Sequence, residues 1–114
     1  MCEGAGWREA FVQRHRFVLS GVELDVIGGR PSIRGECDLS NATEIRSWLS
    51  TFGRSAIEVD LSGVTFIDAA ALNALLAAAW RNPNMRVVEP SSIVERVLEI
   101  TGTTACLVHR QGIH

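Results

Sequence analysis

The sequence predicts a single α/β domain with a mostly parallel or mixed sheet of four to five strands and about three to four helices. Three observations predict it. The chain has 114 residues, enough for one hydrophobic core. Stretches in which apolar residues alternate with polar ones are followed by stretches with apolar spacings of three and four. Single helices separate most of the expected strands, which is typical of parallel crossovers.

The first part of the domain is expected to be a hairpin. Val22, Leu24 and Val26 alternate with acidic residues, which is the period of a half-buried strand. Gly28-Gly29 then predicts a tight turn. A second strand follows over Pro31–Cys37 and directs its isoleucine to the core.

The N-terminal region before this hairpin has no clear period and contains two early glycines. Residues 1–19 are therefore expected to form an arm, and the sequence leaves open whether that arm adds a strand. Residues 20–110 are expected to form the domain itself.

The first helix is expected after Asn41. That residue is a good N-cap, and Glu44 lies three positions on, as in a capping box. Gly53 is expected to end the helix. Its apolar stripe consists of Ile45, Trp48, Leu49 and Phe52.

The second half of the chain predicts further alternation of strand and helix. We expect strands at Ala56–Leu61 and Met85–Val88, a short apolar run at Val64–Ile67, and a last edge strand at Cys106–Val108. A third helix is expected from Pro90 until Gly102.

Between those strands, Ala69–Trp80 is rich in alanine and strongly helical. One side is expected in the core: Leu72, Leu75, Leu76 and Ala79. The other side presents small residues on which a partner can approach closely: Ala70, Asn73, Ala74 and Ala77. For Trp80 we weigh two positions, an interface anchor or packing beneath the Asn82-Pro83 loop, and favour the second.

The composition excludes several function classes. All 11 basic residues are arginine, so no P-loop lysine, Schiff-base lysine or kinase lysine exists. The net charge of −2 gives no sign of a nucleic-acid partner. Neither the three cysteines nor the three histidines have metal-ligand spacing, and we expect no metal or cofactor. Reduced cysteines and the lack of about 20 consecutive apolar residues favour a cytoplasmic protein without membrane insertion.

Two segments resemble the STAS family, the sulphate transporter and anti-sigma factor antagonist domain. Gly35-Glu-Cys-Asp38-Leu matches the end of a family strand, and Asp60-Leu-Ser-Gly-Val-Thr-Phe-Ile-Asp68 matches the signature that leads into a helix. The tail Ser92–Gly102 is also similar to the family's last helix. The resemblance covers roughly residues 20–109 and implies a bacterial anti-sigma factor antagonist, a protein that binds an anti-sigma factor of the serine-kinase type and frees a sigma factor.

The resemblance breaks at one functional position. Bacterial anti-sigma factor antagonists of this family usually carry a serine, phosphorylated by the partner kinase, where this chain has Ala70, and a glycine where it has Ala71. Phosphorylation at that position is chemically impossible here, so the usual release switch is absent. Ser40 and Ser62 stay open as other phosphoacceptors.

The expected partner-binding site lies at one edge of the sheet. Asp38 and Asp68 each follow a strand, and parallel strands bring their carboxyl ends to the same edge, where α/β sheets bind partners. For each aspartate, a purely structural role as a turn residue or helix cap is equally favoured. The full expected site is Asp38, Ser40, Asn41, Asp68, Ala69, Ala70, Ala71 and Asn73.

Other functions stay open beside the antagonist. STAS domains also act as non-catalytic scaffolds in stress signalling and as transporter-associated subunits, for example in lipid import. An enzyme is disfavoured because no histidine or cysteine nucleophile system joins the two aspartates. Nucleotide binding has weak support, a regulatory Cys37–Cys106 pair is a minor alternative, and homodimerisation is left open.

Overall fold

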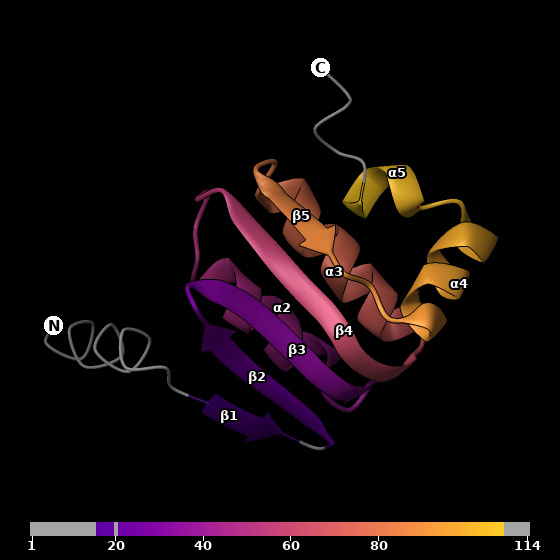
Figure 1. The fold of residues 1–114 in the computed structure, drawn as a ribbon, viewed down its shortest axis with the longest axis horizontal. Helices are drawn as coiled ribbons and strands as arrows, with labels where there is room; N and C mark the ends of the chain where they lie inside the picture. Colours follow the sequence, from indigo (N-terminus) through magenta and orange to yellow (C-terminus); the bar gives the residue numbers. More distant parts are fainter. Residues whose placement is uncertain (1–15, 20, 109–114) are drawn as a thin grey trace, which may run out of the picture.

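The computed structural model describes residues 16–19 and 21–108, which form a five-stranded mixed sheet with helices (Figure 1). Its strands lie side by side in chain order. They are β1 (Arg16–Leu19), β2 (Val22–Ile27), β3 (Arg30–Cys37), β4 (Ile57–Ile67) and β5 (Met85–Val88). The first three strands pair antiparallel, and β3, β4 and β5 pair parallel. The predicted α/β class and mixed sheet are confirmed.

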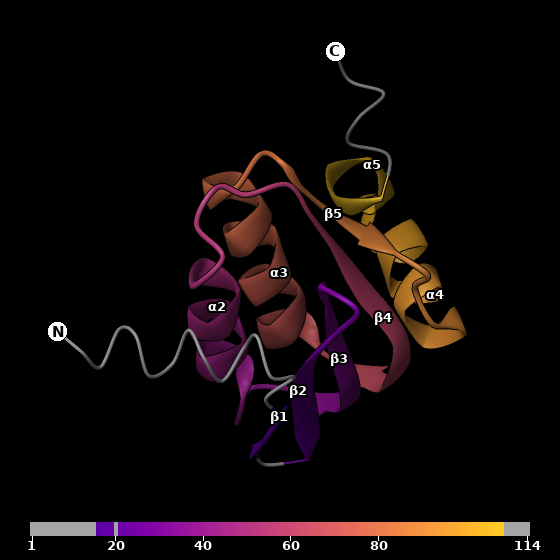
Figure 2. The same ribbon diagram turned by 60° about the vertical axis from the view of Figure 1, so that its left-hand side comes forward.

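The four helices within the described residues are α2 (Ala42–Ser50), α3 (Ala69–Arg81), α4 (Ser92–Thr101) and α5 (Thr104–Leu107). Helices α2 and α3 make the crossovers from β3 to β4 and from β4 to β5, and they pack side by side (Figure 2). None of the helices in this part of the chain is long and apolar enough to cross a membrane.

Two differences from the sequence predictions concern the elements themselves. The segment predicted as an edge strand, Cys106–Val108, overlaps the short helix α5 instead. The two separate apolar runs predicted around Gly63 form one continuous strand, β4. Strand β1 lies within the expected N-terminal arm, for which the sequence left a strand open. Residues 1–15, 20 and 109–114 lie outside the described part of the chain.

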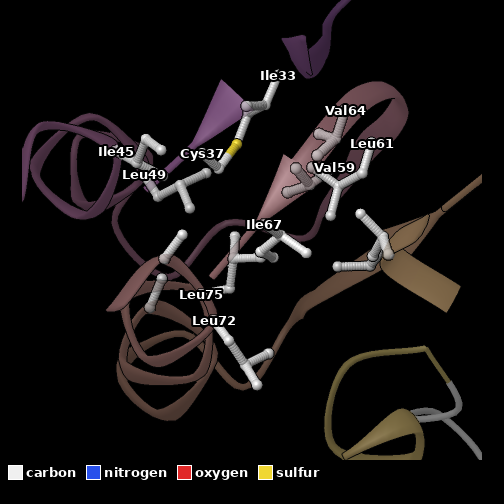
Figure 3. Packing of buried hydrophobic residues seen from close by; sticks show 14 of the residues in the cluster. Ile33, Cys37, Ile45, Leu49, Val59, Leu61, Val64, Ile67, Leu72 and Leu75 are labelled. Atoms are coloured by element: carbon white, nitrogen blue, oxygen red, sulfur yellow. The ribbon is translucent and has the colours of Figure 1, made fainter. Parts of the chain in front are cut away.

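The alternating residues of the strands divide the sheet into two unlike faces. The face toward the helices is apolar and buried, and Figure 3 shows part of this core between the sheet and the helices. Its strand residues include Leu24, Ile33, Val59, Leu61, Met85 and Val87. Helix α4 adds Val94 and Leu98, both buried in the same cluster.

The opposite face carries charged pairs. The Arg86 guanidinium lies 2.6 Å from one carboxylate oxygen of Glu58, and Arg30 lies 3.1 Å from the other. The hydrogen bond from Arg86 holds the pKa of Glu58 below its usual range. Nearer the hairpin, Arg34 pairs with Glu23 at 3.0 Å. Because both partners of these pairs are partly exposed, they contribute little to stability and mainly keep this face polar.

Gly35 occupies a crowded position in the sheet. Its φ of +103° lies in a region that favours glycine, and a Cβ there would clash with the Gly21 carbonyl oxygen. That oxygen already accepts the Glu36 N–H at 2.9 Å. The register of β3 against β4 also shifts between Gly35 and Glu36. Gly35 thus allows β3 to bend just before the strand reaches its carboxyl end.

Replacing Gly35 should therefore destabilise the protein far more than replacing another glycine of positive φ. We expect Gly35→Ala to lower the free energy of unfolding by about 3 kcal/mol or more. Gly53→Ala is the matched control, since its φ is +62° but open space surrounds it, and it should cost about 1 kcal/mol. Urea denaturation followed by circular dichroism measures both, and equal losses would contradict the clash.

Candidate functional site

The carboxyl ends of β3 and β4 meet at one edge of the sheet because the two strands are parallel. Their last residues, Cys37 and Ile67, are register partners. Asp38 follows the first strand directly and Asp68 follows the second. We call residues 38–41 together with residues 68–73 the Asp68 edge. The predicted juxtaposition of the two aspartates is present in the fold.

The Asp68 carboxylate connects the two halves of this edge. Its Oδ1 accepts the backbone N–H of Ala71 at 2.9 Å, which caps the first turn of α3. Its Oδ2 accepts the N–H of Leu39 at 3.1 Å, in the loop that precedes α2. Its own N–H donates to the Cys37 carbonyl at 3.2 Å. Asp68 is therefore both a helix cap and a link between two loops 29 residues apart in the chain.

The loop after β3 is held by side chains of its own. Asp38 Oδ1 accepts hydrogen bonds from the Ser40 hydroxyl at 2.6 Å and from the Ser40 N–H at 3.0 Å. The Asn41 side chain accepts the Asp38 N–H at 3.0 Å and donates to the Glu36 carbonyl at 2.9 Å. A loop with these bonds is preorganised, so a partner would not have to order it.

The predicted capping of α2 by the Asn41 side chain is wrong. Asn41 does stand at the N-cap position, but its side chain makes no capping bond to the helix. Its amide is fully buried and oriented toward the β3–α2 loop instead. The competition between these two uses of one asparagine cannot be read from the local pattern Asn-x-x-Glu.

The predicted site residues differ in accessibility. Ser40, Ala69 and Asn73 are exposed, and Asp38, Asp68 and Ala70 are half-buried. Ala71 is only 1% exposed and belongs to the core, and Asn41 is 0% exposed. The exposed and half-buried side chains can therefore contact a partner directly. Asn41 and Ala71 instead support the edge from within.

Two apolar side chains that were not predicted as site residues lie close to this edge. Leu39 is 77% exposed although its N–H is bound to Asp68. Phe66, two residues before Asp68, is 46% exposed. Large exposed apolar side chains beside small and polar ones are common at the centre of protein interfaces. The signal in the sequence was Leu39 itself, a leucine placed between polar loop residues.

The predicted flat face of small residues on α3 is only partly free. Ala74 is buried, as is Ala78 one turn later, and α3 packs beside α2. Small side chains let two helices approach closely, so this part of the alanine-rich surface serves internal packing. Ala70, Asn73 and Ala77 are the accessible remainder, since Asn73 is exposed and the two alanines are half-buried.

Cys37 lies directly beneath the two aspartates. The side chain is buried, and Figure 3 shows it among Ile33, Ile45 and Leu49. Burial, followed by the charges of Asp38 and Asp68, raises the pKa of the Cys37 thiol to about 12. The thiol is thus protonated at neutral pH and unsuited to nucleophilic or redox chemistry. Cys37 and Cys106 are both free thiols, so the structure contains no disulfide between them.

Comparisons with known proteins identify the family of this chain. A family model described as "Mlab, STAS domain" matches residues 20–109. The chain belongs to the STAS domain family. The crystal structure of an anti-sigma factor antagonist from Mycobacterium paratuberculosis has a similar fold, with a TM-score of 0.61 and 20% sequence identity over 82% of this chain and 80% of that one. A search of curated proteins found no match.

Within the STAS fold of this chain, removal of the Asp68 carboxylate should loosen both loops. We expect Asp68→Ala to lower the free energy of unfolding by about 2–4 kcal/mol, because two charge-assisted hydrogen bonds are lost. Ser91→Ala is the matched control, since Ser91 caps only α4, through a longer bond of 3.4 Å, and should cost about 1 kcal/mol.

Amide hydrogen exchange separates a link between loops from a simple helix cap. In Asp68→Ala the Leu39 amide should exchange faster as well as the Ala71 amide, and in Ser91→Ala neither should change. Unchanged protection of Leu39 in the Asp68 variant would contradict the link.

Cys37 should resist alkylation in the folded protein. At pH 8 a thiol with a pKa of about 12 is almost entirely protonated, so iodoacetamide should leave Cys37 unmodified and label exposed Cys106. Peptide mass spectrometry resolves the two sites, and unfolding in urea should equalise their labelling. Rapid labelling of native Cys37 at pH 8 would show that the thiol is neither buried nor shifted.

Proposed function

We propose that this STAS domain is an anti-sigma factor antagonist that binds an anti-sigma factor of the serine-kinase type and thereby releases a sigma factor. The observation that carries the proposal is the Asp68 edge, where one carboxylate holds two loops together. This edge presents short side chains beside exposed Leu39, a surface suited to docking. The fold shared with a solved anti-sigma factor antagonist supports the same function.

The proposed activity is binding without catalysis. Asp68 and Asp38 both use their carboxylates in hydrogen bonds to loop and helix backbone. The one thiol beneath them, that of Cys37, is protonated and buried. These three groups stabilise the edge, and the proposed partner is a protein of the cytoplasm.

Ala70 deprives the proposed antagonist of release by phosphorylation at this position. The residue lies in the first turn of α3, half-buried and without a hydroxyl to phosphorylate. A phosphate there would add a charge of about −1.5 to −2 beside two aspartates. Two unit charges 4 Å apart repel by about 4 kcal/mol at an effective dielectric of 20, enough to cancel a moderate protein affinity. With alanine, this means of release is removed.

A non-catalytic scaffold or a transporter-associated STAS subunit, for example in lipid import, is the second candidate. Ala70 favours it, because a subunit that stays within an assembly needs no phosphorylation-dependent release. The same edge would then form a permanent interface. Binding to an anti-sigma factor distinguishes this candidate from the antagonist.

A negative charge at position 70 should weaken binding to the anti-sigma factor. In titration calorimetry with purified serine-kinase-type anti-sigma factors from the same genome, we expect Ala70→Asp to weaken binding at least about tenfold relative to Ala70→Asn. Asparagine is the matched control, with nearly the same size and shape and no charge. The cause is the burial of a third carboxylate beside Asp38 and Asp68.

Two results would contradict the antagonist. If none of those anti-sigma factors binds the unaltered chain, the scaffold or transporter candidate replaces it. If the aspartate and asparagine variants bind equally well, the partner does not cover position 70 and the Asp68 edge is not the docking site.

A further inference from the structure

A second surface lies at the opposite ends of α2 and α3. Both helices begin at the Asp68 edge, so both end at the other edge of the sheet, where the loops to β4 and β5 follow (Figure 2). Between their C-terminal halves is an open hollow of about 640 Å³. Leu49 and Ala78, both buried, are among the residues that line it.

The wall of this hollow is shaped by a fixed loop. The Asn82 side chain donates to the Ser55 carbonyl at 2.9 Å, and the Asn84 side chain donates to the Arg54 carbonyl at 2.8 Å. These bonds tie the end of α3 to the segment between α2 and β4. The hollow is therefore built by residues from both helices and both following loops.

The charged side chains that line the hollow are all positive. Arg46, Arg54 and Arg81 line the hollow, all three are exposed, and no acidic residue lines it. None of these guanidinium groups forms an ion pair within residues 21–108. The chain as a whole is acidic, with 13 acidic and 11 basic residues, so a cluster of three arginines is a local departure from its composition. The dipole of α3 accounts for Arg81 alone.

Trp80 adds a large apolar side chain at the same place. It lines the hollow and is 88% exposed, so the expectation that it packs beneath the Asn82-Pro83 loop is wrong. Tryptophan and arginine are the residues most enriched at the energetic centres of protein interfaces. An exposed indole beside three arginines offers one apolar contact and several bidentate partners for carboxylates.

We propose that this hollow docks an acidic segment of a protein partner, with its carboxylates on Arg46, Arg54 and Arg81 and an apolar side chain on Trp80. A peptide fits better than a compact phosphate group. Both helices present their C-termini here, and the partial negative charge of those ends disfavours an anion deep in the hollow. Carboxylates spaced along a peptide can reach the exposed arginines without entering it.

The test uses the full chain and a fluorescein-labelled octapeptide of six glutamates and two leucines. A peptide with glutamine in place of glutamate is the ligand control. We expect the acidic peptide to bind, and the triple change Arg46→Gln, Arg54→Gln and Arg81→Gln to weaken binding at least about tenfold. Trp80→Ala, at an exposed position that leaves folding intact, should weaken it about fivefold.

Arg96→Gln is the matched charge control, because Arg96 is exposed on α4 and outside the hollow. It should leave the affinity unchanged, as should Ala70→Asp at the Asp68 edge, which keeps this inference separate from the proposed function. The Trp80 indole N–H resonance should shift on titration with the peptide.

Three outcomes would overturn the inference. The first is absence of binding, or equal binding of the glutamine peptide. The second is an equal loss with Arg96→Gln, which would indicate attraction to charge anywhere on the surface. The third is displacement of the labelled peptide by ATP or inorganic phosphate at a concentration below the dissociation constant of the peptide. That result would assign the hollow to phosphate compounds.

Discussion

The hydrogen bonds of the Asp68 carboxylate are the constraint on which the arrangement of the proposed site depends. Parallel strands β3 and β4 bring two chain segments to one edge, but each segment continues into its own helix. Asp68 joins them by accepting one N–H from each side, that of Ala71 and that of Leu39. A carboxylate has four lone-pair sites, so it can cap a helix and hold a loop together. A neutral serine cap has one oxygen and no charge for the same task.

The same aspartate can therefore have both a structural role and a role in binding. Asp68 is a helix cap by geometry, and its second oxygen makes the neighbouring loop part of the same surface. Asp38 likewise forms a local turn with Ser40 while standing at the edge. Ordering the loops before binding reduces the entropy lost on association, which is what a domain that acts by docking needs.

Much of the fold could be predicted because local patterns and packing agree. The hairpin at Gly28-Gly29, the alanine-rich α3 and the helix ended by Gly102 each follow from period, propensity or backbone freedom. Short segments were harder. Cys106–Val108 is too short for its apolar residues to distinguish a strand from the helical turn observed. Strand β4 continues through Gly63 because that residue pairs with Arg34 of the neighbouring strand β3.

The site was predictable in position and less so in detail. Motif and topology placed Asp38 and Asp68 together, whereas the burial of Asn41 and Ala71 and the exposure of Leu39 and Trp80 depend on tertiary packing. The arginine-lined hollow had no local signal, since its three arginines come from α2, the following loop and α3. Residues that come together only in the folded chain have no characteristic spacing in the sequence.

Hydrogen–deuterium exchange of the protein with and without a serine-kinase-type anti-sigma factor locates the docking surface. If the Asp68 edge is that surface, the amides of residues 38–41 and 69–73 should exchange more slowly on binding, whereas those of β2 and β3, whose side chains form the charged face, should be unchanged. Slower exchange in β2 and β3, with the Asp68 edge unaffected, would contradict docking at this edge.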